Sequence, residues 1–300
     1  GAIYPQGFSH LQGFWTDPLP RICYQMGTTT LDKTVSMVRN ENSTIISYRI
    51  KGYRGLLRIV PLIHDRSFHA AGDLPPIHQN TWGKGTTILS QTSFSIFSDL
   101  ARYIPQERVY SNFEYEEERR RGLGWKENLF SPGCFELDVS GEAEFAIIAS
   151  TWRSSLANWR ADQDRERERL ISLKAPVPPL ARAADSFLVK RGNALSLIAG
   201  YHWFDDWGRD AMIALPGLLL STGRYEAARL VLSSFAGAMK DGVLPNDLGA
   251  RSYNTVDASL WFVQATSRYY DATGDLDFLA ELWPKLLAVV ERYSRPGDDF

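Results

Sequence analysis

The sequence predicts two kinds of structure in series, an antiparallel β-sandwich followed by a helical domain. The first half carries short β-branched or alternating runs separated by Gly, Pro and Asp, which is typical of a sandwich. The second half carries apolar residues at helical spacing in successive segments. A proline-rich stretch at Pro176–Pro179 separates the halves. We therefore expect an α+β multidomain fold.

The predicted sandwich domain covers residues 1–155. In the segment TIISYRI, alternation places Ile46, Tyr48 and Ile50 on one face of a strand. Glycine, proline and aspartate pairs are expected to form turns at Lys51-Gly52, Ala71-Gly72-Asp73, Pro132-Gly133 and Ser140-Gly141. The expected strands are Thr44–Ile50, Leu56–Ile63, Gln91–Ile96, Val109–Tyr115 and Glu142–Ser150.

A helical linker is expected over residues 156–179. Its core is the charged run DQDRERER, Asp162–Arg169, in which acids precede arginines by three positions. That spacing favours ion pairs along a solvated helix, and the prolines that follow mark a boundary.

Residues 180–300 are expected to form helix hairpins. Thr222-Gly223-Arg224-Tyr225-Glu226 is echoed 51 positions later by Thr273-Gly274-Asp275-Leu276-Asp277, and each copy separates two helices. Two helices per repeat is typical of stacked or barrelled hairpins. The expected helices are Leu180–Leu197, Ala211–Ser221, Tyr225–Lys240, Ala258–Thr273 and Leu276–Tyr293.

The composition excludes several classes of function. A net charge of -2 lacks the basic footprint of a nucleic-acid-binding protein. No apolar run reaches the roughly 20 residues of a membrane span. The two cysteines, Cys23 and Cys134, favour a reducing compartment, so we expect a cytoplasmic protein. The chain has no initial methionine and stops soon after a predicted helix, and we expect it to be part of a longer protein.

Carboxylates gather where two predicted helices begin. If consecutive helices are antiparallel, the helices that start near Asp210 and Asp257 are parallel, and the loops WFDDWGRD and YNTVD meet on one rim. This rim would also hold Asp205, Asp206, Arg209, Trp203 and Trp207. Glycoside hydrolysis uses paired carboxylates, with charged groups on the sugar hydroxyls and aromatic rings on its apolar faces.

A purely structural interpretation stays open for each acid alone. Asp210 could cap a helix, and Asn254 with Asp257 resembles a capping box. Arg209 could pair with Asp205 or Asp206. The convergence of four acids, an arginine and two tryptophans favours a site.

At these residues the chain resembles the amylo-α-1,6-glucosidase family, the bacterial and archaeal relatives of the C-terminal half of glycogen debranching enzyme. The resemblance rests on AGYHWFDDWGRDAMIALPGLLLSTGRYEAAR (Ala199–Arg229), GVLPND (Gly242–Asp247) and YNTVDASLWF (Tyr253–Phe262). It implies an (α/α)6 barrel behind the sandwich, of which residues 180–300 would be the first half. It also implies inverting hydrolysis of the α-1,6-linked glucose at a branch point.

Residue by residue, the resemblance implies that Asp257 is the general acid. Arg209 and Asp210 would hydrogen-bond the reacting glucose, Asp206 and Trp207 would line the same pocket, and Asn246 would approach it. The family's general base is a late glutamate for which this chain offers no candidate, because Glu281 and Glu291 belong to a helix far from the rim.

Three hypotheses follow. The first is a debranching glucosidase acting on an α-glucan or a glycogen-derived oligosaccharide. The second is a glucoamylase-like or trehalase-like α-glucosidase, since W-x-R-D occurs in those enzymes too. The third is a non-catalytic glucan-binding fragment. No cofactor and no metal are predicted, no membrane or nucleic-acid partner is expected, and the oligomeric state stays undetermined.

Overall fold

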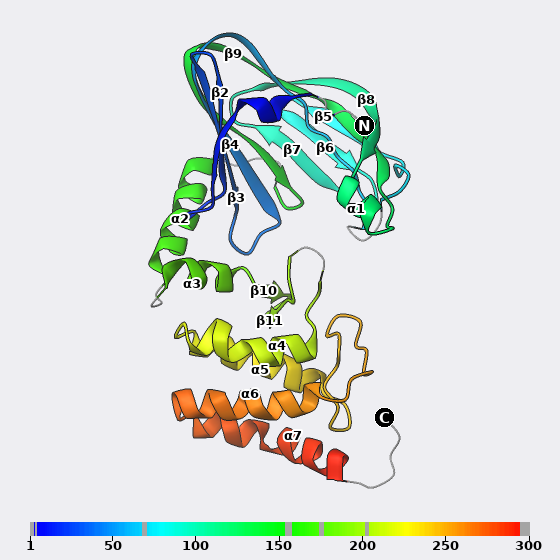
Figure 1. Cartoon of the computed structure of the whole chain (residues 1–300), viewed down its shortest axis with the longest axis vertical. Coiled ribbons are helices and arrows are strands. Elements are labelled where there is room, and N and C mark those ends of the chain that lie inside the picture. Colours follow the sequence, from blue (N-terminus) through cyan, green and yellow to red (C-terminus); the bar gives the residue numbers. More distant parts are fainter. Residues whose placement is uncertain are drawn as a thin grey trace. The chain divides into compact units, whose positions relative to one another are not determined.

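The chain divides into two compact units, Gly1–Ile171 and Ser172–Phe300, seen in a computed structural model (Figure 1). The structure describes residues 3, 5–67, 71–153, 158–173, 177–201 and 204–294. The division falls at the end of helix α2 (Trp159–Ser172), within the stretch 156–179 that the sequence suggested as a linker.

The first unit is built on one large antiparallel sheet, which confirms the antiparallel β structure predicted for this half of the chain, whereas the sandwich itself stays a prediction. The strands follow the order β1-β2-β3-β4-β9-β7-β6-β5, and β8 also pairs with β9. The strands are β1 (Leu11–Trp15), β2 (Arg21–Met26), β3 (Thr29–Met37), β4 (Ser43–Ile59), β5 (His78–Trp82), β6 (Gly85–Leu89), β7 (Phe94–Ser98), β8 (Arg102–Glu114) and β9 (Lys126–Ser150), with two short helices, η1 (Gly7–His10) and α1 (Glu116–Arg120).

A bulge at Gly52 corrects the turn predicted at Lys51-Gly52. β4 runs straight through this position and stays paired with β9 from Ser43 to Ile59, with a register shift between Lys51 and Tyr53. Gly52 has a φ of 71°, and a Cβ there would lie 2.5 Å from the carbonyl oxygen of Thr28. A glycine between two apolar runs is equally typical of a turn and of a bulge, and here it is a bulge. The turns predicted at Pro132-Gly133 and Ser140-Gly141 likewise lie inside β9.

The bulge changes which face of the sheet each side chain of β4 occupies. Tyr48 lies before it and Leu57 and Ile59 lie after it, an odd number of positions away, yet all three pack against the same core. Strand side chains alternate with a period of two, so one extra residue is what brings them to a common face.

Two residues of β9 that lie far apart along the strand contribute to that core. Phe135 and Phe145 are each 1% exposed and belong to one cluster. Tyr48 stacks on Phe145 with ring centroids 5.3 Å apart, and Tyr103 packs against Phe135 at 5.1 Å. Since residues ten positions apart on one strand meet in one cluster, the sheet curls around its own apolar interior.

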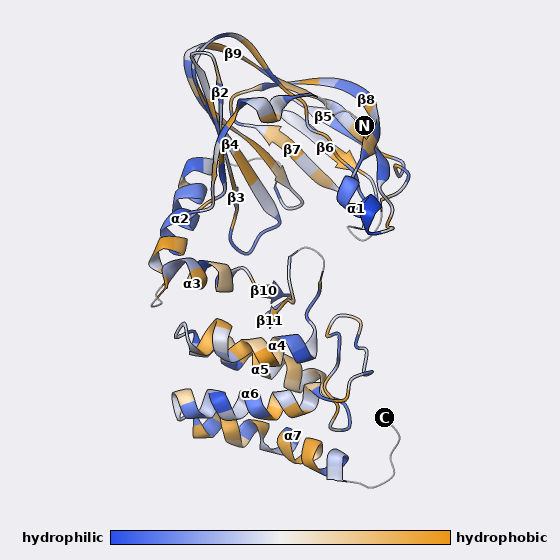
Figure 2. Ribbon diagram, viewed as in Figure 1, coloured by the Kyte–Doolittle hydropathy of each residue, from blue (hydrophilic) through white to orange (hydrophobic). Residues whose placement is uncertain are grey.

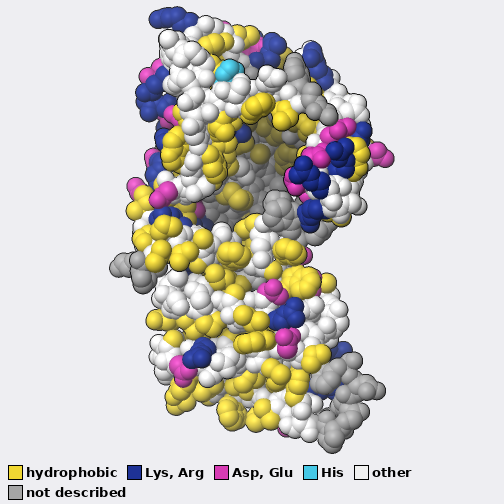
Figure 3. All heavy atoms as spheres, viewed as in Figure 1, with side chains coloured by type: hydrophobic (Ala, Val, Ile, Leu, Met, Phe, Trp, Pro, Cys, Tyr) yellow, Lys and Arg dark blue, Asp and Glu magenta, His cyan; other side chains and the backbone are white. Residues whose placement is uncertain are grey.

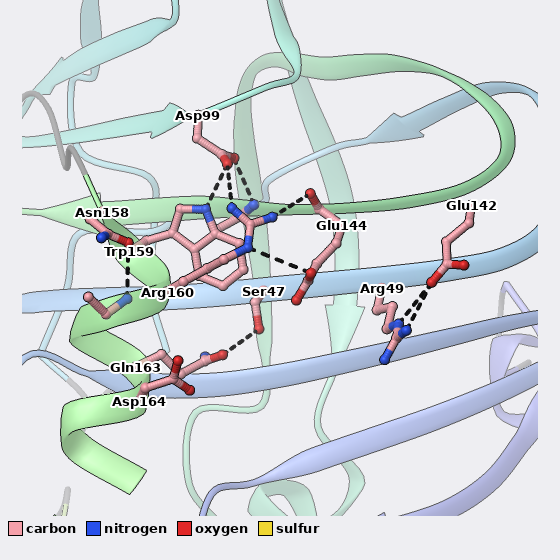
Figure 4. Close-up of polar contacts among 12 residues, drawn as sticks. Ser47, Arg49, Asp99, Glu142, Glu144, Asn158, Trp159, Arg160, Gln163 and Asp164 are labelled. Carbon is pink, nitrogen blue, oxygen red and sulfur yellow. Dashed lines mark hydrogen bonds and ion pairs between the residues drawn. The ribbon is translucent and has the colours of Figure 1, made fainter. Parts of the chain in front are cut away.

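Helix α2 packs on the sheet of the first unit (Figure 4). The indole of Trp159, 3% exposed, donates a 2.7 Å hydrogen bond to Asp99, and Ser47 donates to the side chain of Gln163 at 3.1 Å. The other carboxylate oxygen of Asp99 accepts the amide of Ala146. The predicted i,i+3 ion pairs do form, but one side of the helix is buried, so it is not a helix solvated all round.

The second unit is mainly helical, and its first segment corrects the sequence interpretation. The helix predicted over Leu180–Leu197 ends at Asp185, and a two-stranded hairpin follows, turning at Gly192-Asn193. A glycine–asparagine pair between apolar runs is a hairpin signal that the helical spacing concealed. The elements are α3 (Pro178–Asp185), β10 (Leu188–Arg191), β11 (Ala194–Leu197), α4 (Gly208–Leu215), the π-helix η2 (Pro216–Leu220), α5 (Tyr225–Ala238), α6 (Ala258–Thr273) and α7 (Leu276–Ser294).

Apolar side chains on these helices form a second core. Met212, Phe235, Phe262 and Phe278 are each at most 1% exposed and share one cluster. Figure 2 shows how apolar residues recur along the helices. The pattern matches the amphipathic spacing predicted for this half of the chain.

Helix α7 is apolar on a second face as well. Phe278, Leu282, Leu286 and Val289 are buried in the core, whereas Trp283, Leu287 and Val290 are exposed at 53%, 44% and 55%. Hydrophobic side chains are correspondingly prominent on the surface of this unit (Figure 3). A helix that is apolar on most of its circumference is typical of the interior of a larger protein.

Candidate active site

Two helix N-termini meet in the second unit, as the helical repeat led us to expect. α4 begins at Gly208 and α6 at Ala258, and the two helices pack against each other. Nη1 of Arg209 lies 3.9 Å from Oδ1 of Asp257. The WFDDWGRD and YNTVD segments therefore share one rim, which we define as residues 204–210, 245–248 and 252–257.

The 245–248 segment lies against the start of α4. The amide of Gly208 donates a 2.9 Å hydrogen bond to the carbonyl oxygen of Asn246, and the amide of Leu248 donates to the carbonyl oxygen of Asp206 at 3.1 Å. A Cβ on Gly208 would lie 2.2 Å from the carbonyl oxygen of Pro245. Glycine at this position is therefore required by the close approach of the two backbones.

Asn246 links the two sides of the rim. Its carbonyl accepts the amide of Gly208, and its own amide donates to the carbonyl of Ser252 at 2.6 Å. Its side-chain Nδ2 donates to Oδ1 of Asn254 at 3.4 Å, and the hydroxyl of Ser252 donates to the same oxygen at 2.7 Å. The WGRD and YNTVD segments are thus bridged through one residue. Sequence reasoning had considered Asn254 only as a helix cap.

Asp257 occupies the N-cap position of α6 but does not cap it. The cap makes no side-chain hydrogen bond, and the amide of Ala258 instead donates to Oγ1 of Thr255 at 3.4 Å. The capping-box alternative, which needs Asp257 inside the helix, is not what the structure adopts. The side chain of Asp257 is 43% exposed and lies beside Arg209, so its carboxylate is accessible to a ligand.

Neighbouring elements hold the loop that carries Asp257. The hydroxyl of Tyr253 donates to the carbonyl of Ala238 at 2.8 Å, and the hydroxyl of Tyr293 donates to the carbonyl of Val256. The buried hydroxyl of Ser259 accepts the amide of Leu244 at 2.8 Å. A carboxylate on a loop fixed from several sides keeps one position, which catalysis by proton transfer requires.

Arg209 and Asp210 are both exposed in the first turn of α4, and Trp207 precedes them, half-buried. The guanidinium of Arg209 lies near Asp257, and within the described part of the chain it forms no ion pair with Asp205 or Asp206. The N-terminus of α4 adds a partial positive charge beside Asp210. Trp203, the other tryptophan predicted here, lies outside the described residues.

Asp206 is placed differently from the other predicted residues. It is 1% exposed, and Arg191 of β10 binds it with two hydrogen bonds, from Nε at 2.7 Å and from Nη2 at 2.6 Å. The hydrogen bonds to Asp206 raise the pKa of the Arg191 guanidinium above its ordinary value. A role for Asp206 in lining the pocket stays a prediction, and Arg191 is a residue that sequence reasoning missed.

A cavity of about 320 Å³ is lined in part by Arg191 and is bounded by the hairpin, α5 and residues 248–251. Its lining includes Arg191, Leu195, Ser234 and Arg251, and none of the predicted site residues. In the part of the chain that the structure describes, no cluster of His, Cys, Asp or Glu side chains could hold a metal ion. The described helices also include none long and apolar enough to cross a membrane.

Family models of glycogen debranching proteins match both halves of the chain. The family model described as "Glycogen debranching enzyme N terminal" matches residues 1–146, and the model described as "Amylo-alpha-1,6-glucosidase" matches residues 182–300. The chain belongs to the amylo-α-1,6-glucosidase family.

The chain is also similar to one related sequence and one solved structure. It is 36% identical to the glycogen debranching enzyme of Saccharomyces cerevisiae over 98 residues, which are 30% of this chain and 6% of that protein. Its fold is similar to that of a bacterial glucoamylase solved in complex with acarbose, with a TM-score of 0.60 and 12% identity. That match covers 96% of this chain and 50% of the glucoamylase chain, so this chain spans only part of each relative.

Proposed function

We propose that this chain is part of a glycoside hydrolase that releases α-1,6-linked glucose at branch points of glycogen or a related α-glucan. One observation carries the proposal: Asp257 stands at a helix N-terminus without capping it, exposed, with Arg209 3.9 Å away. A carboxylate that its own helix does not use is available to a substrate. The family to which the chain belongs supports the choice of substrate.

In this proposal Asp257 is the general acid and protonates the glycosidic oxygen of the leaving glucan. Arg209 and Asp210 hold the hydroxyls of the reacting glucose by charge-assisted hydrogen bonds. Trp207 and Asn246 line the same subsite. Asp206, whose carboxylate is bound by Arg191, supports this subsite from below the surface.

The reaction inverts the anomeric carbon, and an inverting site keeps its two carboxyl groups roughly 6.5–9.5 Å apart with water between them. We assign no general base within these 300 residues. Glu281 lies 3.6 Å from Arg229 of α5 in an ion pair, which supports leaving it out of the site.

The fold-level part of the proposal is a β-sandwich followed by the first helices of an (α/α)6 barrel. The curled sheet of the first unit and the likeness to a glucoamylase support it. The two apolar faces of α7 support it too, because helices of a closed barrel contact neighbours on both sides. The two cysteines are free thiols, in keeping with the cytoplasmic location that we propose.

The test is the substitution Asp257→Asn in the full-length protein, with glucose release from a branched limit dextrin as the readout. We expect activity to fall by about 10²–10⁴-fold, the usual contribution of a general acid, with an unchanged melting temperature. Asp271→Asn, which alters an exposed acid on the same helix, is the matched control and should keep full activity. Retained activity in Asp257→Asn would refute the assignment.

A glucoamylase-like preference for α-1,4 bonds is the second candidate, favoured by the structural likeness. Hydrolysis rates on α-1,6-linked and α-1,4-linked oligosaccharides of equal length separate the two. If the full-length protein binds maltooligosaccharide and releases no glucose from either, the chain serves as a glucan-binding module instead.

A further inference from the structure

Arg191 and Asp206 form the most buried charged contact near the rim. The side chain of Asp206 is 1% exposed and that of Arg191 is 44% exposed. Both oxygens of the carboxylate are taken by one guanidinium, at 2.7 Å and 2.6 Å. A buried carboxylate without a partner is strongly destabilising, so this pairing fixes where Asp206 can lie.

Arg191 belongs to the β10–β11 hairpin, which is anchored in the core of the second unit. It is the last residue of β10 and pairs with Ala194 across the hairpin. The hairpin is anchored by the buried side chains of Leu188 and Leu197, and the hydroxyl of Ser234 on α5 donates to the carbonyl of Leu195 at 2.8 Å. The guanidinium therefore reaches Asp206 from an element that is part of the core.

The backbone of Asp206 is close in sequence to Arg209 and Asp210, the residues proposed to bind the glucose. Its carbonyl accepts the amide of Leu248, and the next two residues bridge to Asp247 and Asn246. Arg209 is three residues further on, at the first turn of α4. The side chain of Asp206 is held by the hairpin and its main chain by the 245–248 segment, so the ion pair sets the start of α4.

We propose that Arg191 is a positioning residue for the rim: through its two-pronged ion pair with Asp206 it fixes Arg209 and Asp210 relative to Asp257. This inference rests on the proposed glycosidase function. In this role Arg191 acts through Asp206 and not on the sugar itself. Lysine would keep the charge but lose the planar fork that engages both carboxylate oxygens, so Arg191→Lys isolates the geometric role.

The matched control is a second arginine–aspartate pair in the same unit. Nη1 of Arg224 lies 2.9 Å from Oδ1 of Asp185, and both side chains are largely buried. This pair links α3 to the segment before α5, and neither residue belongs to the rim. Arg224→Lys should therefore weaken stability to a similar degree without altering chemistry.

The first readout is steady-state hydrolysis of a branched oligosaccharide by the full-length protein. We expect Arg191→Lys to lower kcat by about 10–100-fold with little change in KM, because the groups that bind the glucose remain but are misaligned. Arg224→Lys should keep the wild-type kcat per folded molecule. If Arg191→Lys does not fold, Asp206→Asn takes its place. The side-chain amide of asparagine has one acceptor oxygen and cannot accept both hydrogen bonds from Arg191, so this variant should show the same loss of kcat.

The second readout needs no activity. In the 300-residue chain, hydrogen exchange at the amides of Gly208 and Leu248 should accelerate in Arg191→Lys and stay unchanged in Arg224→Lys. If kcat and exchange in Arg191→Lys both match the wild type, Arg191 has no positioning role. A wild-type protein that hydrolyses no glucan would refute the proposed function instead, and the exchange experiment would still report on the ion pair.

Discussion

The amide of Gly208 and the carbonyl oxygen of Asn246 are joined by a 2.9 Å hydrogen bond that brings the first turn of α4 against the 245–248 segment. Here the backbone at the start of α4 and the 245–248 segment approach each other as closely as neighbouring strands in a sheet, and Trp207 forms an isolated β-bridge with Asp247. The contact positions the residue before Arg209 and leaves no room for a side chain. It is the point at which the rim is most sensitive to a single added methyl group.

Gly208→Ala should therefore disrupt the rim. A Cβ at 2.2 Å from the carbonyl oxygen of Pro245 forces one of the two segments to move. We expect a loss of about 1–3 kcal/mol in the free energy of unfolding, typical of overpacking, together with reduced glucan hydrolysis. Urea denaturation and glucose release check this.

Gly217→Ala is the control for that experiment. A Cβ at Gly217 meets nothing within 4 Å, and the residue lies in the helical segment after α4. This change should leave hydrolysis intact and stabilise the protein slightly, by about 0.4–1 kcal/mol. Equal effects from both alanines would mean that the close contact at Gly208 is unimportant.

Trp159→Phe should loosen the packing of α2 on the sheet of the first unit. The substitution removes the indole N–H that donates to Asp99 and leaves this carboxylate, whose side chain is 25% exposed, short of one partner. The expected cost is about 1–3 kcal/mol of unfolding free energy. Chemical denaturation followed by circular dichroism measures it. Trp152→Phe alters a tryptophan that is 63% exposed and should change the midpoint little.

The stability of the first unit should fall in acid partly because of Glu127. Burial alone would raise the pKa of Glu127, but hydrogen bonds from Arg66 and Tyr115 outweigh it, and the pKa lies below its ordinary value. A carboxyl whose pKa is lowered by folding stabilises the protein above its unfolded pKa of about 4.3, and this contribution disappears as the pH falls through the folded value.

The measurement is the urea midpoint between pH 6 and pH 3. Glu127→Gln should lower the midpoint at pH 6 and flatten its dependence on pH below about 4.3, since the titrating group is gone. Glu142→Gln removes a carboxyl whose pKa is also lowered, by the hydrogen bond from Arg49, but whose side chain is 54% exposed and screened by solvent, so it should flatten the slope less. A variant at Glu127 with an unaltered slope would contradict this prediction.

Helix α6 shows what could be predicted from sequence. Its predicted bounds, Ala258–Thr273, are those of the structure, because the helix carries strong apolar spacing and ends at Gly274. The helix predicted over Leu180–Leu197 fails after Asp185 because its apolar spacing fits a hairpin as well as a helix. Strands such as β2 and β5 were not predicted, because β2 is half-buried on both faces without alternation and β5 is mostly polar.

Part of the rim was predictable from the order of the helices. Arg209 and Asp257 come together because the helix order alone implies parallel axes for α4 and α6. Arg191 was missed because it acts through a tertiary contact with Asp206, and nothing local in the sequence selects it over Arg209 as the partner. The roles assigned to these residues in catalysis remain predictions.

The extra residue at Gly52 reverses which positions of β4 point into the core and which point away from it. Upstream of it even-numbered side chains such as Tyr48 point to the core, and downstream odd-numbered ones such as Leu57 do. Deleting this single glycine would turn the apolar residues of the distal half of the strand toward water. Length changes within β4 should therefore be tolerated among relatives only in compensating pairs, and an alignment that places a lone gap there is misaligned.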